Sequence, residues 1–400
     1  MINLNENNKV RLKGVNLGGW LLMEGYILGG RNIAEREFKN KFRKIHGNEG
    51  LCLLERYFRD NFIVEEDFKR ISLLGANCIR VPFNYRLIEK KPFIYHKDGF
   101  VYLDKVFRWA EEYNLGVILD LHAACGSQNC DWHSDSKGRA SLWEKASYRE
   151  RTCCLWEAIA DRYKEKRNLF GYDVLNEPVI VKENTPVLKA FYGGLVRRIQ
   201  AIDKDHTIFL EGNLWAQEVD FLRDLLTDGV TVSIHAYQPL NHTFHFLPGL
   251  KYPGKIDGVY WNKSRVEKYL EKFYNFSRRN KVDIFVGEFG INYRGNYEGE
   301  VEYLNDIMEV FDKFSFHYTY WTYKAVAGFC FPDGIYQYLL NPAYVRREGP
   351  VYGWENYLTL WKKRKKDIIR FWRTEGYTLN KDIANVLREY FRGQKTENRK

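Results

Sequence analysis

Eight short apolar segments, separated by longer amphipathic ones, constrain the fold of this 400-residue chain more than any other feature. The apolar segments lie at residues 10–16, 77–83, 116–122, 168–180, 206–212, 229–237, 282–290 and 316–324. Helical segments between them are expected at 62–75, 101–114, 147–166, 186–202, 217–227, 263–280 and 298–313. This alternation predicts a parallel sheet covered by helices, and eight units favour a closed (β/α)8 barrel of the TIM-barrel type.

An open, doubly wound sheet would instead carry a glycine-rich phosphate loop after its first strand. The chain reads GVNLGGW at that point, which lacks the G-x-G-x-x-G spacing, and it contains no G-x-x-x-x-G-K-[ST] loop. A nucleotide-binding sheet is therefore disfavoured.

The segments outside the strand–helix repeat predict two additions to one catalytic domain spanning residues 1–400. Residues 28–61 are expected to form a helical insertion after the first strand, and residues 330–400 a helical extension packed on a barrel of about 10–324. The stretch from Glu355 to Lys400 holds 13 Lys/Arg against 6 Asp/Glu, most of the net charge of +10. We interpret this run as a solvated helical face, with an anionic partner as the alternative.

Two glutamates lie at the ends of two predicted strands that are both apolar. Glu177 comes after the apolar run at 169–175 and directly before Pro178, which has no backbone N–H and ends the strand. Glu288 ends the strand VDIFVGEFG. A barrel brings strand ends together at one face. Two carboxylates there predict glycosidic bond cleavage, with one as proton donor and the other as nucleophile or base.

Other polar or aromatic side chains occupy equivalent strand ends, and each could instead be a structural partner. They are Arg80, His122, Asn176, His235, Tyr237 and Trp321. Buried polar groups are costly unless they serve one another or a ligand, so this set favours a site. We expect Arg80 and Tyr237 to hold Glu288 ionised, and Trp321 to stack on the sugar.

Further loop residues are candidates for outer sugar subsites, although a tryptophan near a strand end packs on its neighbours as often. These residues are Trp20, Asn84, Trp132, His133 and Trp215.

A zinc site made of His122, Cys125, Cys130 and His133 is an alternative use of the loop HAACGSQNCDWH. All four ligands would fall within one short loop, so we expect no metal and no cofactor. The seven cysteines have no disulfide spacing, which suggests reduced thiols; Cys125 and Cys130 could pair only in an oxidising setting.

The N-terminal residues lack the apolar segment of a signal peptide, and no run of 18 apolar residues exists. We expect a cytoplasmic protein with no membrane or nucleic-acid partner, although a chain trimmed of its signal would read the same. The oligomeric state cannot be deduced from the sequence.

From about Val10 to Lys324 the chain resembles glycoside hydrolase family 5, through GVNLGGW, CIRVPF, ILDLH, VLNEP, SIHAY, GEFG and YWTYK in that order. The resemblance implies a retaining enzyme with Glu177 as acid/base and Glu288 as nucleophile. Arg80, His122, Asn176, His235, Tyr237 and Trp321 take the family's active-site places.

The resemblance leaves the substrate open. GEFG and WTYK suggest β-1,4-linked hexose oligosaccharides or polysaccharides, of mannan or glucan type. GVNLGGWLLMEGYI, FIVEEDF and HAACGSQN suggest an exo-β-1,3-glucanase, although Cys125 stands where those relatives tend to have proline. A catalytically silent carbohydrate-binding barrel is the alternative from another class.

Overall fold

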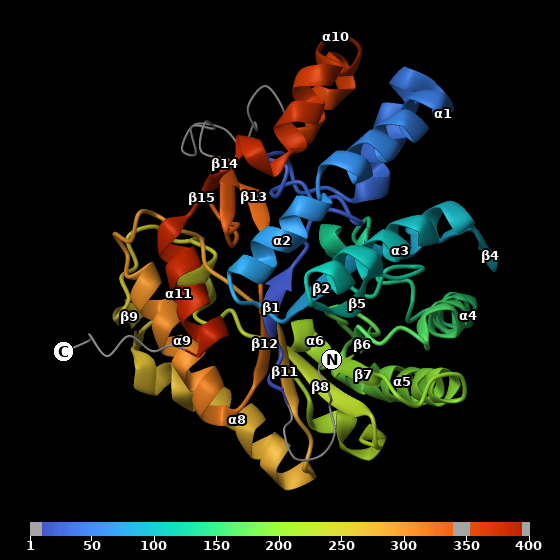
Figure 1. The fold of residues 1–400 in the computed structure, drawn as a ribbon. Coiled ribbons are helices and arrows are strands. Elements are labelled where there is room, and N and C mark those ends of the chain that lie inside the picture. The colour runs from blue at the N-terminus through green and yellow to red at the C-terminus, as the bar shows by residue number, and fades with distance from the viewer. Residues whose placement is uncertain (1–9, 339–352, 394–400) are drawn as a thin grey trace.

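Eight parallel strands close into a barrel with helices around it, which confirms the predicted fold class (Figure 1). The structure is a computed structural model that describes residues 10–338 and 353–393. The barrel strands are β1 (Lys13–Asn16), β2 (Cys78–Asn84), β5 (Gly116–Ala123), β6 (Leu169–Asp173), β7 (Thr207–Glu211), β8 (Val230–His235), β11 (Ile284–Phe289) and β12 (His317–Tyr320). Their order around the barrel is β1-β12-β11-β8-β7-β6-β5-β2.

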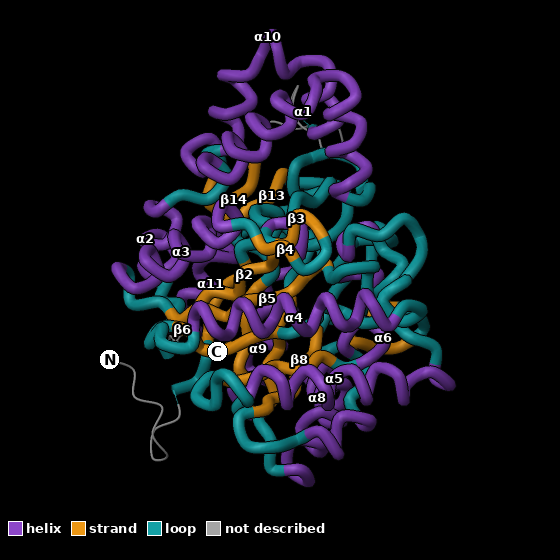
Figure 2. The backbone as a smooth tube through the Cα atoms, turned by 90° about the vertical axis from the view of Figure 1, so that its right-hand side faces the viewer, coloured by secondary structure: helices purple, strands orange, loops and turns teal. Residues whose placement is uncertain are grey.

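Helices cover the outside of the barrel, as the tube view shows (Figure 2). They are α2 (Glu65–Leu73), α3 (Lys97–Glu112), α4 (Ala146–Tyr163), α5 (Thr185–Gln200), α8 (Lys263–Asn280) and α9 (Glu300–Phe314). Each follows the expected segment to within a few residues, because its apolar positions recur at helical spacing and pack on the strands. None of the helices in the described ranges is long and apolar enough to cross a membrane.

The predicted helix over 217–227 is wrong. The chain there forms only the 3-10 helix η4 (Asp220–Leu225), preceded by the four-residue helix α6 (Asn213–Ala216). Residues Leu214 and Trp215 adopt left-handed backbone angles, with φ of 52° and 56°. L-residues in that region do not continue a right-handed helix, so no α-helix runs from α6 into the following segment, which forms only η4.

The insertion after β1 is the long helix α1 (Glu35–Asn61), which begins later than the expected residue 28 and is kinked at Gly47. It lies beside α10 (Trp354–Trp372) as a pair standing out from the barrel (Figure 1). Aromatic rings join the pair: Phe38 stacks on Trp354 with ring centroids 4.6 Å apart. Residues far apart in the sequence therefore build one hydrophobic contact.

The segment after β12 packs on the barrel through a small sheet and a helix. Strands β13 (Lys324–Val326), β14 (Tyr336–Tyr338) and β15 (Thr378–Leu379) pair with one another, and α11 (Lys381–Arg392) lies against α9. Parts of the expected extension, 339–352 and 394–400, lie outside the described residues.

A buried lysine ties this segment to the rest of the molecule. The Lys324 side chain is fully buried, and its Nζ donates hydrogen bonds to the carbonyls of Phe62 and Trp372, the latter at 2.8 Å. A third bond reaches Thr374 Oγ1 at 3.0 Å. Because Phe62 follows α1 and Trp372 ends α10, Lys324 in β13 fixes both helices to the small sheet.

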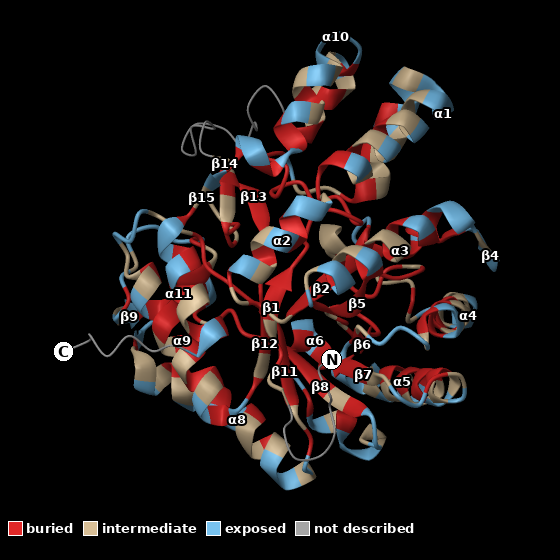
Figure 3. Ribbon diagram, in the orientation of Figure 1, coloured by how far each residue is buried: buried red, intermediate tan, exposed pale blue. Residues whose placement is uncertain are grey.

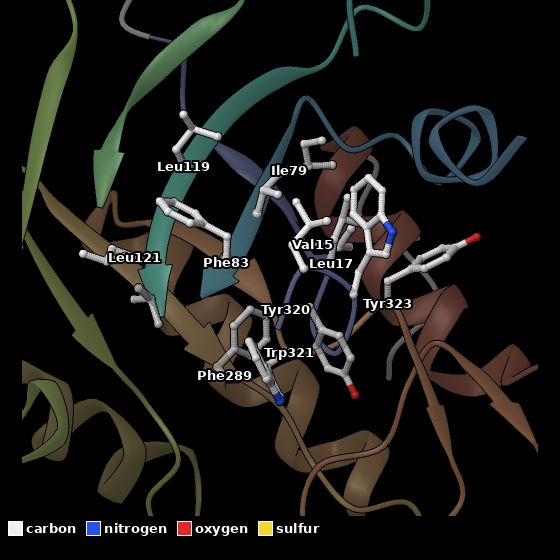
Figure 4. Close-up of a cluster of buried hydrophobic side chains, with 14 of the residues drawn as sticks. Val15, Leu17, Ile79, Phe83, Leu119, Leu121, Phe289, Tyr320, Trp321 and Tyr323 are labelled. Carbon is white, nitrogen blue, oxygen red and sulfur yellow. The ribbon is translucent and has the colours of Figure 1, made fainter. Parts of the chain in front are cut away.

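The core fills the barrel and the layer between strands and helices, where Figure 3 shows the strands buried. The close-up in Figure 4 draws part of it, with Ile79, Phe83, Leu119 and Leu121 from β2 and β5. Trp321, just after β12, is buried beside Tyr320 in the same view.

Candidate active site

Glu177 follows β6 in a strained turn. Its φ of 45° lies in the left-handed region that non-glycine residues rarely adopt. Two hydrogen bonds hold the turn: Glu177 N donates to Glu211 Oε2 at 2.6 Å, and Asn129 Nδ2 donates to Glu177 O at 2.8 Å. Such strain persists only where the surroundings over-determine it, and it clusters at functional sites.

The carboxylate of Glu177 lies between two histidines. His235 Nδ1 donates to Glu177 Oε1 at 2.6 Å, and His133 Nε2 lies 3.4 Å from Oε2. Burial alone would raise the pKa of Glu177, but the positive charges of His235 and His133 outweigh burial and lower it. The structure thus places His133 against the predicted acid, closer to the reaction centre than an outer subsite.

Glu288 at the end of β11 is held by a cation and a hydroxyl. Arg80 Nη1 donates to Oε1 at 2.8 Å and Tyr237 OH donates to Oε2 at 2.9 Å, while His235 Nδ1 lies 3.6 Å from Oε2. One oxygen from each of Glu177 and Glu288 lies within 4.8 Å of the other and of a His235 ring nitrogen. The two glutamates therefore face each other across a narrow gap.

Arg80 is the charge centre beneath this gap. Its side chain is fully buried, and besides Glu288 it contacts Asp120 at 3.1 Å, Asp173 at 2.8 Å and Glu211 at 3.0 Å. One guanidinium thus serves four carboxyl groups, and its planar fork is suited to contacts in several directions. These carboxyl groups lie on β5, β6, β7 and β11, so Arg80 joins side chains from four strands of the barrel.

The pKa values of the carboxyl groups around Arg80 are shifted in different directions. Burial raises the pKa of Asp120 to about 7 and that of Asp173 well above its ordinary value, although Arg80 opposes both shifts. Burial would also raise the pKa of Glu211, but the cations of His235 and Arg80 hold it at about 2. The pKa values of Asp173 and Glu211, which share the Arg80 guanidinium, are therefore shifted in opposite directions.

Among the described residues, two groups of three side chains bring possible ligand atoms within 4.8 Å of one another. One is Glu177, His235 and Glu288, and the other is Asp120, Asp173 and Glu211. Arg80 already neutralises the second group. Neither group includes Cys125, which is buried, or Cys130, which is exposed, so the geometry does not support the zinc alternative.

The remaining predicted strand-end residues converge on the same site. His122 Nδ1 lies 2.7 Å from Asp120 Oδ2, and the His122 ring stacks on Trp321 with centroids 5.3 Å apart. Asn176 Oδ1 accepts a hydrogen bond from Arg80 Nη2 at 2.9 Å. Their side chains are thus pre-oriented by protein partners.

Trp215 lies at the exposed edge of the site, where 45% of its surface is accessible. Its Nε1 donates to Asp131 Oδ2 at 2.8 Å, and Asp131 also lies 3.7 Å from His133 Nε2. Leu214, Trp215 and Ala216 all have positive φ. These three strained residues present the indole to solvent, and backbone strain of this kind clusters at functional sites.

Two of the predicted outer-subsite residues need correction. Trp20 is buried, stacks on Trp109 and donates its Nε1 hydrogen bond to Arg59 O at 2.9 Å, so it is part of the core. Asn84 is also buried, and its amide donates to Glu35 Oε2 at 2.8 Å and to Asp135 Oδ2 at 3.3 Å. These side chains are already occupied by protein partners.

The structure also adds residues that the sequence reasoning missed. Asp120 and Glu211 face inward near strand ends. The search for polar side chains at strand ends that found His122 could therefore have included them. Glu24 is buried close enough to Glu177 and Glu288 to feel their charge, and burial first and then these charges raise its pKa well above the ordinary range. Tyr26 accepts a hydrogen bond from Trp321 Nε1. No periodicity marks these last two, because they lie in the loop after β1.

The chain is similar to known proteins along most of its length. The family model "Cellulase (glycosyl hydrolase family 5)" matches residues 36–326. A β-xylosidase from Phanerodontia chrysosporium is 30% identical over 336 residues, covering 80% of this chain and 68% of that protein. Endoglucanase C from Acetivibrio thermocellus is 25% identical, covering 78% and 90%. A solved glycoside hydrolase structure superposes with a TM-score of 0.64 at 20% identity, covering 95% of this chain and 99% of that one.

Proposed function

Because this chain belongs to glycoside hydrolase family 5, we propose that it is a retaining β-glycosidase that uses Glu177 as acid/base and Glu288 as nucleophile. The observation that carries the proposal is the close approach of the two carboxylates, with oxygens within 4.8 Å. Retaining enzymes keep their carboxyl groups about 5–5.5 Å apart, whereas inverting enzymes need about 6.5–9.5 Å to fit a water molecule.

In the first step Glu288 attacks the anomeric carbon of the sugar. The new bond joins a Glu288 oxygen to that carbon while the bond to the leaving oxygen breaks, and a proton passes from Glu177 to the leaving oxygen. Because His235 and His133 lower the pKa of Glu177 in the free protein, Glu177 has to take up this proton as the substrate binds. Arg80 and Tyr237 support this role, since both donate to Glu288 and favour its ionised form.

In the second step a water attacks the same carbon, gives its proton to Glu177 and releases Glu288. His235 and His133 stabilise the Glu177 carboxylate that exists between the two steps. Asn176 is proposed to bond the sugar 2-hydroxyl, a contact that strengthens as the ring becomes oxocarbenium-like. Trp321 is proposed as the stacking surface for that ring.

The proposed substrates are β-1,4-linked hexose chains of glucan or mannan type, probed first as short oligosaccharides. The similarity to an endoglucanase over most of both chains supports this choice. The second candidate is an exo-β-1,3-glucanase, favoured by the motif that carries Glu24 and places this carboxyl beside the catalytic pair.

Early-time NMR of product anomers on mannohexaose, cellohexaose and laminarihexaose tests mechanism and linkage together. We expect a β-configured first product from a β-1,4 chain. An α-configured first product would overturn retention, and turnover of laminarihexaose alone would overturn the linkage.

Variants assign the two roles. Glu288→Ala should abolish turnover of every substrate. Glu177→Ala should be severe on oligosaccharides but mild on an activated aryl glycoside, whose leaving group needs no proton, and azide should rescue it with a β-glycosyl azide as product. Glu183→Ala, at an exposed glutamate, is the matched control and should behave as wild type. Equal losses in the Glu177 and Glu288 variants on the aryl glycoside would contradict the assignment.

A further inference from the structure

The side chain of Glu211, at the end of β7, holds the backbone of the turn that carries Glu177. The hydrogen bonds between β6 and β7 end with Val174 N, which donates to Phe209 O at 3.3 Å. Asn176 N donates instead to a carbonyl of β5, at 3.1 Å. The N–H of Glu177 then meets the Glu211 carboxylate, at 2.6 Å. A side chain therefore supplies the acceptor that the sheet no longer supplies.

Glu211 is itself fixed by the sheet. It pairs in register with Ser233 of β8, and its own carbonyl accepts a hydrogen bond from Tyr192 OH at 3.1 Å. Its side chain is fully buried. Groups on the strands of a scaffold hold a site more precisely than groups on loops, so Glu211 is a firm anchor for the strained turn.

Two amide side chains hold the same turn from the loop after β5. Asn129 Nδ2 donates to Glu177 O at 2.8 Å, and Gln128 Nε2 donates to Asn176 O at 2.8 Å. These bonds do not involve Glu211. A change at Glu211 should therefore shift Glu177 without releasing the whole turn.

The Glu211 carboxylate also reaches a second group that holds Glu177. Its Oε1 accepts a hydrogen bond from Arg80 Nη2 at 3.0 Å and lies 3.2 Å from His235 Nε2. The other nitrogen of that ring, Nδ1, donates to Glu177 Oε1 at 2.6 Å. Glu211 thus acts on Glu177 along two routes, directly on its backbone N–H and through the imidazole that binds its carboxylate.

A role as a plain counter-ion of Arg80 does not account for Glu211. Arg80 is already paired with three other carboxyl groups. They are Asp120 at 3.1 Å, Asp173 at 2.8 Å and Glu288 at 2.8 Å. A fourth buried carboxyl group adds negative charge where charge is costly. Glu211 differs from these three in its hydrogen bond to the Glu177 N–H.

We propose that Glu211 is a positioning residue for the acid/base, whose carboxylate aims Glu177 at the glycosidic oxygen by holding the turn and the imidazole of His235. This inference rests on the proposed function, because it takes Glu177 as the acid/base. Glu211 is fully buried and does not touch the sugar. Its loss should therefore slow proton transfer and leave substrate binding nearly unchanged.

Glu211→Gln tests this geometry. Glu177 N and Arg80 Nη2 donate to different oxygens of the carboxylate, whereas an amide has one acceptor oxygen and turns its NH2 group toward one of these donors. On a hexasaccharide that the wild type hydrolyses, kcat should fall roughly 100-fold, the effect of a misplacement of about 1 Å. KM should stay within about twofold of the wild type.

Two further variants separate reach from charge. Glu211→Asp keeps the charge but shortens the side chain by one methylene, so it cannot keep all three contacts. Its kcat should fall at least about 10-fold on the same hexasaccharide, whereas a counter-ion role would leave it close to wild type. Glu218→Gln is the matched control, at an exposed glutamate in the same connection between β7 and β8, and it should behave as wild type.

A double-variant cycle shows whether Glu211 acts through Glu177. Azide-rescued turnover of an activated aryl β-glycoside by Glu177→Ala is the reference, because that reaction no longer uses the acid/base. Adding Glu211→Gln to this background should cost less than about threefold, and the remaining activity reports that the double variant is folded. A loss there as large as that of Glu211→Gln alone on the hexasaccharide would mean that Glu211 acts elsewhere, and would overturn the inference.

The outcomes separate the two proposals. Wild-type kcat in Glu211→Gln on the hexasaccharide would overturn the positioning role while leaving the glycosidase intact. A Glu177→Ala variant that azide does not rescue would count against the proposed function itself. If Glu211→Gln does not fold, the same measurements on Glu211→Asp decide the inference.

Discussion

Replacing His133 by glutamine gives the most quantitative test of the charge arrangement around Glu177. Burial of the His133 imidazole disfavours its charge, but the nearby carboxylates of Asp131, 3.7 Å away, Glu177 and Glu24 outweigh burial and raise the pKa of His133 to about 9. Glutamine keeps a donor of similar length but removes the titrating charge. The variant therefore isolates the charge from the shape.

The magnitude follows from the shift. The pKa of His133 rises from the ordinary value of 6.5 to about 9. This rise means that folding is about 3 kcal/mol more favourable when the imidazole is protonated than when it is neutral. Because the pKa is raised in the folded state, this stabilisation is fully present below pH 6.5 and is lost as the pH rises through about 9.

Denaturant unfolding of the wild type and of His133→Gln, across the neutral-to-alkaline range, measures this difference directly. The wild type should lose up to about 3 kcal/mol more than the variant over that interval. NMR of the labelled imidazole should find it titrating near 9, and His96→Gln, at an exposed histidine, should follow the wild-type curve. A His133 that titrates at or below 6.5, with parallel stability curves, would refute the electrostatic reasoning.

Three further predictions concern residues elsewhere in the structure. Burial lowers the pKa of Lys324 from 10.5 to about 8. As the pH rises from about 8 to 10.5, the wild type should therefore gain up to about 3 kcal/mol of stability relative to Lys324→Met. Denaturation at several alkaline pH values checks this, and identical slopes of stability against pH in the two proteins would disprove it. Trp215→Ala should raise KM for oligosaccharides much more than for an aryl monoglycoside in steady-state kinetics, whereas equal losses would make Trp215 a packing residue. Trp20→Ala should destabilise by about 3–5 kcal/mol by thermal or chemical unfolding, and a loss below about 1 kcal/mol would contradict its place in the core.

The sequence predicted the barrel strands and the convergence of their polar ends because both depend on local patterns. A strand such as β11, with Glu288 at its end, combines a buried apolar run with one polar residue, and barrel closure then brings such residues together. Arg80, His122 and His235 were found in this way. The same logic covers Asp120 and Glu211.

Loop geometry was much harder to predict, since it depends on contacts that only the tertiary structure creates. Trp20 and Trp215 both follow barrel strands, yet one stacks in the core and the other is presented to solvent by left-handed backbone angles. His133 was expected at the periphery, but the short 3-10 helix η2 (Trp132–Ser134) turns it toward Glu177. Glu24 and Tyr26 carried no periodic signal.

The pairing of α1 with α10 has a consequence for how the chain folds during synthesis. Phe38, Phe42 and Phe58 on α1 contact Trp354, Trp361 and Trp372 on α10.

At a synthesis rate of about 5–20 residues per second, the aromatic face of α1 leaves the ribosome roughly 15–60 s before its partner exists. Until then it is an apolar surface without cover, so ribosome-bound intermediates ending before Trp354 should bind chaperones and aggregate when released. The last helices therefore govern not only the stability of the finished barrel but also the solubility of every unfinished one.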